Sequence, residues 1–314
     1  MGTGELGREE GGSSSPPSSS GRLETQWSRG ARGAFVADIF HTVRAVSRNK
    51  ETEVDWVKTN HVKPALREGR PTAGSWLTLC SAMSAEIMSR AGFDWLLIDM
   101  EHGHGDYQTL LGQLQAIEGS ETIPVVRVQW NDPAVIKRVL DLGAYGVMVP
   151  WIGSRAEAEA AVRAAKYPPA GMRGIAGSHR AGGYGRHAAE YWKRANDEIL
   201  VVIQVETATA VQDIEAIARV PGVDVLFVGP ADLSTALGHM GDPGHAEVQV
   251  AVEKIETAAK AHGVALGNIT RSWEQARELY KRGYQFLTLC SDTSLVVQGA
   301  RDVLARFQQE VRPS

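Results

Sequence analysis

Apolar runs of strand length alternate with helical stretches eight times along this chain, from residue 75 to a last helix at residues 295–308. The runs lie at residues 75–80, 93–99, 123–128, 146–150, 200–206, 223–229, 264–269 and 286–290. Because they are apolar with little alternation, we interpret them as strands of a parallel sheet that is buried on both faces. Eight successive strand–helix units predict an α/β protein with the (β/α)8 TIM barrel fold.

An open, doubly wound sheet is the alternative to a closed barrel. It is disfavoured because the loop after the first strand lacks the G-x-G-x-x-G motif of dinucleotide-binding sheets. The span of residues 75–311 also fits the ~250 residues that are usual for the barrel fold.

The first residues differ in composition from the remainder. Residues 1–33 are rich in glycine and serine, with the run SSSPPSSS at their centre, and such a segment buries too little apolar surface to fold. We expect a disordered tail at residues 1–33, a helical extension at 34–70 and the barrel domain at 71–314. Recurring arginines would suit a transit peptide and a mitochondrial or plastid location. Acidic residues near the start favour a plain tail and a cytoplasmic protein.

The composition argues against several classes of partner. The formal net charge is −4 and no basic stripe interleaved with aromatic residues is present, so we expect no nucleic-acid partner. No apolar run approaches the ~20 residues that a membrane-spanning helix needs, so we expect no membrane partner. The two cysteines, Cys80 and Cys290, are interpreted as small reduced core residues.

The fifth and sixth strands both lead into acidic residues. Side chains alternate along a strand, so Gln204 and Glu206 point the same way. If the two strands are neighbours, Glu206 and Asp232 meet at the carboxyl-end rim, where the active sites of this fold lie. Two carboxylates at that rim suit a hard divalent cation that keeps some water and binds substrate oxygens.

Polar side chains also follow the second and third strands. The second strand ends in Asp99 and leads to His102 and His104, and the third carries Arg127 near its end. Each has a structural explanation as well: a loop cap for the aspartate, a solvated position for either histidine and an ion pair for the arginine. Convergence of all of them on one rim favours a catalytic site over these separate explanations.

Several of these stretches together resemble one known family. The segments IDMEHGHGD, PVVRVQWNDPAVIKRVLDLGA, VPWI, KYPPAGMRG, QVET and VLFVGPADLS are similar, in order and spacing, to those of the HpcH/HpaI aldolases. That family comprises class II pyruvate aldolases typified by 2,4-dihydroxyhept-2-ene-1,7-dioate aldolase and 2-dehydro-3-deoxyglucarate aldolase. The resemblance covers essentially residues 75–307 and leaves the N-terminal segment outside it.

The resemblance implies a metal-dependent aldolase that cleaves a 4-hydroxy-2-oxo acid reversibly to pyruvate and an aldehyde. A 2-dehydro-3-deoxy sugar acid or 2,4-dihydroxyheptenedioate would be such a substrate. It further implies that Glu206 and Asp232 bind a divalent cation, Mg²⁺, Mn²⁺ or Co²⁺, with Gln204 close by. Backbone N–H groups at a helix start would hold the pyruvate carboxylate, in the turn formed by Gly229, Pro230, Ala231 and Asp232.

The resemblance also implies catalytic roles for four further side chains. Arg127 would hold the keto oxygen as it becomes an enolate, and a guanidinium suits this because it stays protonated. His102, oriented by Asp99, would move the proton. Asp141 would reach the His–Asp pair of a neighbouring subunit, in a trimer or hexamer whose last helix packs on a neighbour. No lysine lies at a strand end, which disfavours Schiff-base chemistry.

Some positions depart from the family pattern. Met100 stands where glycine is common, and His104 lies in a segment that is less basic in the family. The glycine-rich loop at residues 173–185 is interpreted as the place where aldehyde specificity is set. Two other functions stay open. One is a citramalyl- or malyl-thioester lyase, which the pairing of His102 with Asp99 disfavours, and the other is a non-catalytic barrel that serves as an assembly module.

Overall fold

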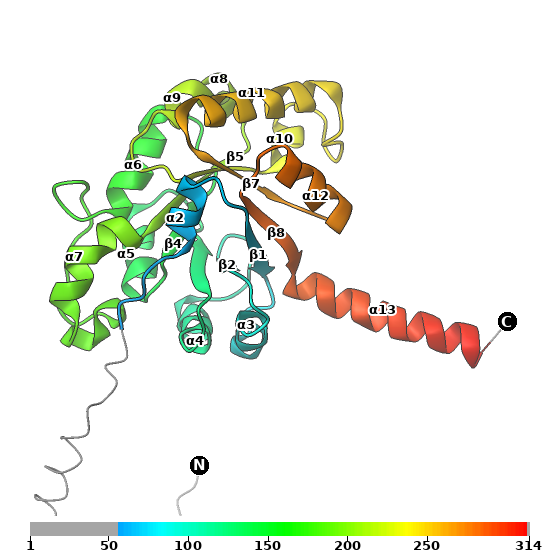
Figure 1. Cartoon of the computed structure of the whole chain (residues 1–314), viewed down its shortest axis with the longest axis horizontal. Coiled ribbons are helices and arrows are strands. Elements are labelled where there is room, and N and C mark those ends of the chain that lie inside the picture. Colours follow the sequence, from blue (N-terminus) through cyan, green and yellow to red (C-terminus); the bar gives the residue numbers. More distant parts are fainter. Residues whose placement is uncertain (1–55, 313–314) are drawn as a thin grey trace, which may run out of the picture. The chain divides into compact units, whose positions relative to one another are not determined.

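The computed structural model describes residues 56–312, so the predictions for residues 1–33 and for 34–55 fall outside the described residues. In the described part, eight parallel strands close into a barrel in sequence order, and β8 pairs with β1 (Figure 1). This closure confirms the (β/α)8 TIM barrel. The open doubly wound sheet is wrong, because such a sheet would leave two edge strands unpaired.

The eight strands lie close to the predicted positions. They are β1 (Thr72–Leu77), β2 (Trp95–Asp99), β3 (Ile123–Arg127), β4 (Gly146–Val149), β5 (Leu200–Val205), β6 (Val225–Val228), β7 (Ala265–Ile269) and β8 (Phe286–Ser291). The first strand begins earlier than predicted, and residues 78–80 belong to the loop that follows it. Polar residues that follow the strands therefore share one rim, as the fold requires.

Most α-helices of the described residues cover the outside of the barrel. These α-helices are α2 (Val62–Arg67), α3 (Ala82–Ser89), α4 (Tyr107–Ile117), α5 (Pro133–Asp141), α6 (Arg155–Ala165), α7 (Ala188–Glu198), α8 (Ala208–Gln212), α9 (Ile214–Ala218), α10 (Pro230–Ala236), α11 (Ala246–His262), α12 (Trp273–Lys281) and α13 (Asp292–Glu310), and α2 and α13 are the exceptions that do not cover it. The helical stretch between β5 and β6 is interrupted at Asp213, whose carboxylate accepts a hydrogen bond from the N–H of Arg155 (2.7 Å). Within residues 56–312, no helix combines the length and apolarity needed to cross a bilayer.

Large aromatic side chains fill the barrel interior. The rings of Trp95 and Phe286 stack with centroids 3.6 Å apart, and both side chains are fully buried. The indole N–H of Trp95 donates to Oγ1 of Thr72 (3.1 Å), so its polar atom is satisfied. Gly74 is required here, because a Cβ atom would lie 2.2 Å from the Trp95 ring. The interior is therefore a packed core and not a channel.

The short helix α2 packs against the inside of the barrel. Val62 and Leu66 belong to the same buried cluster as Trp95 and the other interior side chains. The ammonium group of Lys63, also on α2, donates to the carbonyl of Ile199 (2.7 Å), directly before β5. These contacts place α2 at the end of the barrel where the strands begin.

A second buried lysine lies beside the first. The ammonium group of Lys166 donates to the carbonyls of Asn196 (2.6 Å) and Ile199 (2.8 Å). Burial, together with the neighbouring charge of Lys63, lowers the pKa of Lys166 to about 7. This lysine sits at the amino ends of the strands, far from the rim that carries the predicted site, so its effect falls on stability.

The last helix is tied to the barrel only at its start. The carboxylate of Asp292 accepts hydrogen bonds from the backbone N–H groups of Thr78 (2.9 Å) and Leu79 (3.2 Å), in the loop after β1. All of α13 is described, and among its residues Asp292 alone is buried. Figure 1 shows α13 leaving β8 and running away from the barrel. Its apolar side chains are exposed: Leu295, Val296, Val297, Val303, Leu304 and Phe307.

Candidate active site

Asp99 and Arg127 lie side by side at the rim, because they are register partners on β2 and β3. The guanidinium donates from Nε to Oδ1 of Asp99 (3.0 Å) and from Nη2 to Oδ2 (2.6 Å), a bidentate pair. Both side chains are buried. Burial works against the charged carboxylate, yet the hydrogen bonds and charge of Arg127 hold the pKa of Asp99 below its ordinary value.

Trp76, a residue that the sequence did not single out, completes this pair. Its indole N–H donates to Oδ2 of Asp99 (3.1 Å), and its ring centroid lies 4.6 Å from the guanidinium carbon of Arg127. A guanidinium above an aromatic face gains a cation–π attraction, which is stronger out of water. The feature of the sequence that could have identified Trp76 was its position in a strand, because side chains alternate between the two faces of a strand.

His102 is held differently from the prediction. Oδ1 of Asp99 accepts the backbone N–H groups of Glu101 (3.0 Å) and His102 (3.2 Å), while Arg127 occupies both carboxylate oxygens. The imidazole of His102 is exposed and makes no hydrogen bond to any described residue, and the same holds for His104. Asp99 therefore fixes the backbone of His102 and leaves its ring free, which corrects the predicted orientation of the ring by Asp99.

Glu101 is a rim residue that the sequence analysis missed. Its Oε2 lies 2.9 Å from Nη1 of Arg127, and its Oε1 accepts the indole N–H of Trp151 (3.0 Å). Burial raises the pKa of Glu101 above its ordinary value, although the charge of Arg127 opposes this. Its place in the same segment as Asp99 and His102 was the signal that could have identified it.

Trp151 links two of the rim carboxylates through a disfavoured backbone conformation. Its φ of 58° lies in the left-handed region, which costs energy for any residue other than glycine. In this conformation its backbone N–H donates to Oε1 of Glu206 (2.9 Å), while its indole reaches Glu101. Such outliers persist only where the surroundings enforce them, and they are concentrated at functional sites.

Gln204 and Glu206 point the same way at the end of β5, where the side-chain amide of Gln204 donates to Oε2 of Glu206. Both are buried, and Oε1 of Gln204 has no hydrogen-bond partner among the described residues. A Cβ atom on Gly229 would lie 2.5 Å from Oε2 and 3.0 Å from Cβ of Glu206, so a larger residue there would force Glu206 to shift. The end of β6 is thus shaped around the two polar side chains of β5.

Gly229 leads into the turn that starts α10. Pro230 is its first residue and Asp232 lies in its first turn. The backbone N–H groups of Ala231 and Asp232 donate to no other described residue, as expected at a helix start. Burial, opposed by the hydrogen bond from Trp151 and aided by the negative charges of Asp232 and Glu101, raises the pKa of Glu206 to about 7. Asp232 is therefore close enough to act on Glu206.

The donor set at this rim fits a hard divalent cation. Glu206 and Asp232 offer carboxylate oxygens, and the buried Oε1 of Gln204 is an additional oxygen without a partner. Carboxylates also outnumber cationic groups here, since Asp99 and Glu101 already share Arg127. A bound cation would offset the mutual repulsion of the two remaining carboxylates.

Asp141 and the glycine-rich loop at residues 173–185 lie away from this rim. Asp141 is the last residue of α5, where the chain returns to the start of a strand, and its carboxylate pairs with Nη2 of Arg173 (2.6 Å). The loop joins α6 to α7 at the same end, and Arg180 within it donates to the carbonyl of Leu142 (2.8 Å). The loop therefore cannot set aldehyde specificity at the rim of its own chain, because it belongs to a helix-to-strand connection.

Comparison with known proteins identifies relatives of this chain. The family model described as HpcH/HpaI aldolase/citrate lyase matches residues 72–299. A 4-hydroxy-2-oxo-heptane-1,7-dioate aldolase from Klebsiella pneumoniae subsp. pneumoniae is 45% identical over 253 residues, which are 79% of this chain and 94% of that protein. A 2-dehydro-3,6-dideoxy-6-sulfogluconate aldolase from Pseudomonas putida is 42% identical over 76% of this chain and 94% of its own length.

A solved structure agrees with these relatives. A HpcH/HpaI aldolase/citrate lyase family protein from Burkholderia cenocepacia J2315 superposes with a TM-score of 0.77 at 41% identity, covering 81% of this chain and all of that one. The family match spans the whole barrel and includes every rim residue described above. The chain therefore belongs to the HpcH/HpaI aldolase/citrate lyase family.

Proposed function

We propose that this protein is a metal-dependent aldolase that cleaves a 4-hydroxy-2-oxo acid reversibly to pyruvate and an aldehyde. The observation that carries the proposal is the convergence of Glu206, Gln204 and Arg127 on one rim, beside the turn that holds Asp232. The names of the similar proteins, two aldolases of 2-oxo acids, support an aldol cleavage over a thioester lyase or a non-catalytic assembly module.

Glu206 and Asp232 are the residues that would hold the divalent cation, Mg²⁺, Mn²⁺ or Co²⁺, with Gln204 beside them. When bound, such a cation polarises the keto group of the substrate and stabilises the negative charge that develops on it. The free N–H groups of Ala231 and Asp232 orient the carboxylate of the 2-oxo acid. This divides binding of the 2-oxo acid between the ends of β5 and β6.

Arg127 is the second group that stabilises the developing enolate oxygen. Its guanidinium is already oriented by Asp99, by Glu101 and by the ring of Trp76, so it does not reorganise when charge develops. Asp99 acts through Arg127 in this scheme and is a positioning residue. Arginine suits the role because it does not lose its proton at physiological pH.

His102 is the proposed acid–base residue. Its backbone is anchored by Asp99 and its exposed imidazole is free to turn toward a substrate at the rim. The imidazole takes the proton of the 4-hydroxyl, the C3–C4 bond breaks, and C4 leaves as the aldehyde. The electron pair of that bond passes to the 2-oxo group as an enolate, and a proton delivered to C3 then gives pyruvate.

We also infer that the protein is a homo-oligomer, a trimer or hexamer. The apolar side chains along α13 are exposed in the single chain, and Val303 is 71% exposed. A second copy is a suitable cover, since apolar patches of this kind mark interaction surfaces. In such an assembly Asp141, at the end of the barrel opposite to the rim, would approach the His102 of a neighbouring chain.

The test of the function is pyruvate release from a panel of 4-hydroxy-2-oxo acids, followed with a lactate dehydrogenase couple. The panel includes 4-hydroxy-2-oxoheptanedioate and a 2-dehydro-3-deoxy sugar acid. Release that stops with EDTA and returns with Mg²⁺, Mn²⁺ or Co²⁺ is the expected result. Release that persists in fully chelated protein would disprove the metal requirement. A folded, metal-loaded protein that acts on no member of the panel would disprove the aldolase.

The test of the acid–base residue is His102→Ala, with His104→Ala as the matched control because both histidines are exposed neighbours in one loop. His102→Ala should lower kcat about 10²–10⁴-fold, the usual contribution of general acid–base catalysis. Binding of Mn²⁺ should be unchanged, since His102 is not one of the proposed metal ligands. Equal rates for the two variants would show that His102 does not move the proton.

A further inference from the structure

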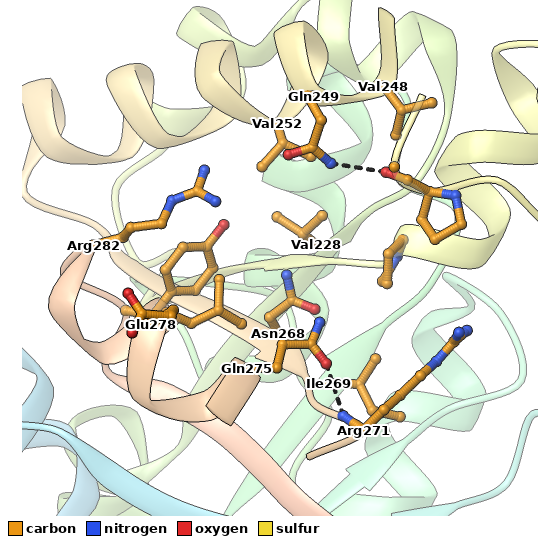
Figure 2. Close-up of a pocket in the computed structure, with 15 residues that line it drawn as sticks. Val228, Val248, Gln249, Val252, Asn268, Ile269, Arg271, Gln275, Glu278 and Arg282 are labelled. Carbon is orange, nitrogen blue, oxygen red and sulfur yellow. Dashed lines mark hydrogen bonds between the residues drawn. The ribbon is translucent and has the colours of Figure 1, made fainter. Parts of the chain in front are cut away.

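A pocket of about 360 Å³ opens between α11 and α12, on the outer side of β6 and β7 (Figure 2). Its walls come from both helices, and Val228 and Asn268 of the two strands form its floor. The rim residues Glu206 and Arg127 do not line it, so it is separate from the candidate active site.

The floor of this pocket carries an amide oxygen without a hydrogen-bond partner. Asn268 is only 7% exposed, and its Oδ1 has no hydrogen-bond partner among the described residues. Figure 2 shows the amide in the middle of the pocket, between Val228 and Gln275. Burying an amide oxygen without a partner is costly, and nearly all buried polar groups in proteins are paired. A ligand group that donates a hydrogen bond would satisfy this oxygen.

The mouth of the pocket carries an arginine without an anionic partner. Arg271 donates its backbone N–H to Oε1 of Gln275 (2.9 Å), but its guanidinium bonds to no described residue. The other arginine of the pocket, Arg282, pairs with Glu256 (2.7 Å), and Glu278 pairs with Lys281 (2.9 Å). The uncompensated charge at the mouth is therefore that of Arg271, which favours an anionic ligand.

The walls of the pocket are mostly apolar, which favours a ligand with an apolar body. The side chains of Val248, Val252 and Leu279 line the cavity together with Val228 and Pro230. We propose that this pocket is a second ligand site, which takes a small carboxylic acid with an apolar body and a polar group that reaches Asn268. Its carboxylate pairs with Arg271 at the mouth, and its body lies against the valines and leucine.

The pocket also adjoins the turn that carries the proposed pyruvate contacts. Pro230 lines the cavity and is the first residue of α10, directly before Ala231 and Asp232. A ligand that packs on Pro230 acts on the position of those two residues, so the site regulates the rim. This regulatory part rests on the proposed function, whereas ligand binding itself does not.

The first experiment measures binding by calorimetry on the full chain, with Mg²⁺ and saturating pyruvate present to occupy the rim. 3-(4-Hydroxyphenyl)propanoate is the probe, because its hydroxyl can donate to Asn268; 3-(4-hydroxyphenyl)propan-1-ol is the uncharged control, and succinate the carboxylate without an apolar body. The probe should bind at least about tenfold more tightly than either control. Failure of the probe to bind, or equal binding of all three, would overturn the site.

Two variants localise the binding. Arg271→Gln should weaken binding of 3-(4-hydroxyphenyl)propanoate about tenfold, the loss expected for one charge-assisted hydrogen bond. Arg163→Gln, on the exposed side of α6, is its matched control and should leave binding unchanged. Gln249→Trp places an indole across the mouth from an exposed position and should abolish binding. Unchanged binding in both pocket variants would overturn the assignment to this pocket.

The proposed regulation of the rim is tested by a separate kinetic measurement. The KM for the 4-hydroxy-2-oxo acid should shift when 3-(4-hydroxyphenyl)propanoate is added to the wild-type protein, and the shift should vanish in Gln249→Trp. Binding of the probe with no change in KM or kcat would overturn regulation while the binding site stands. A protein without any turnover would refute the proposed function instead, and calorimetry would still report on the pocket.

Discussion

Arg127 donates two hydrogen bonds to Asp99, at 3.0 and 2.6 Å, and a third guanidinium nitrogen lies 2.9 Å from Glu101. The orientation of the guanidinium is therefore set before any substrate arrives. Preorganised donors of this kind stabilise developing charge without reorganising during the reaction. The pair follows from strand register, since Asp99 and Arg127 are partners on neighbouring strands.

Replacing Asp99 by asparagine should lower kcat about 10²–10³-fold, the cost of disturbing one preorganised oxyanion donor. The substituted amide places an N–H group against the guanidinium, so one of the two hydrogen bonds is lost and Arg127 turns. The KM should change far less, because Asp99 makes no contact with the proposed pyruvate turn. Pyruvate release at saturating metal measures both constants.

The control for that experiment is Asp106→Asn in the same segment. Asp106 caps α4 by accepting the N–H of Thr109 (2.9 Å), and asparagine caps a helix equally well. The kcat of the Asp106→Asn variant should therefore match the wild-type value. A wild-type kcat in Asp99→Asn would contradict the positioning role of Asp99.

Replacing Glu206 by glutamine should weaken Mn²⁺ binding at least about 100-fold, because a carboxylate ligand becomes a neutral amide in the proposed site. The fold should survive, since glutamine has nearly the same shape and the buried charge of Glu206 is already disfavoured. Calorimetry measures the affinity for Mn²⁺, and a thermal melt measures whether the fold survives. Glu253→Gln on the exposed face of α11 is the control, and equal Mn²⁺ affinity in the two variants would contradict the assignment.

The buried Lys166 should make folding stability depend on pH. Burial first, and the charge of Lys63 next, lower its pKa from an ordinary 10.5 to about 7. Below this pH the lysine is protonated in both the folded and the unfolded chain. Above it the unfolded chain keeps a proton that the folded protein has lost, so the free energy of unfolding rises with pH by up to about 1.4 kcal/mol per unit.

The measurement compares Lys166→Met with the wild type by urea unfolding. The wild type should gain about 2 kcal/mol relative to Lys166→Met between about pH 7 and about pH 9. Lys193→Met, at an exposed position of α7, should show the wild-type pH dependence. A constant difference between wild type and Lys166→Met across this range would show that Lys166 keeps its ordinary pKa.

A charge on α13 should disrupt the proposed oligomer. Val303→Asp puts a carboxylate in the exposed apolar surface of α13, where a second copy is expected to pack, and burying it there is costly. Size-exclusion chromatography with light scattering should show a smaller species than the wild type. Val250→Asp is the matched control, because Val250 on α11 is 65% exposed and lies away from α13. Identical masses for all three proteins would contradict the role of α13.

Local patterns were sufficient to predict the barrel and the rim. Hydrophobic runs and helix caps depend on residues close in sequence, so eight strand–helix units could be located without a structure. The side-chain alternation that sets Gln204 and Glu206 on one face is likewise a local property. The glycine at position 229 is recognisable as a turn residue, but the two side chains that would crowd a Cβ atom there come from another strand.

The pairing of the rim side chains could not be predicted in this way. It depends on strand register and on loop paths, which no local pattern records. Asp99 was expected to orient the ring of His102, yet the register of β2 on β3 gives both its oxygens to Arg127. The left-handed Trp151 joins Glu101 to Glu206 across three loops, and nothing in its own neighbourhood indicates this. The sequence by itself determined which residues reach the rim. Only the tertiary structure decided which of them pair, because pairing depends on distances between chain segments far apart in the sequence.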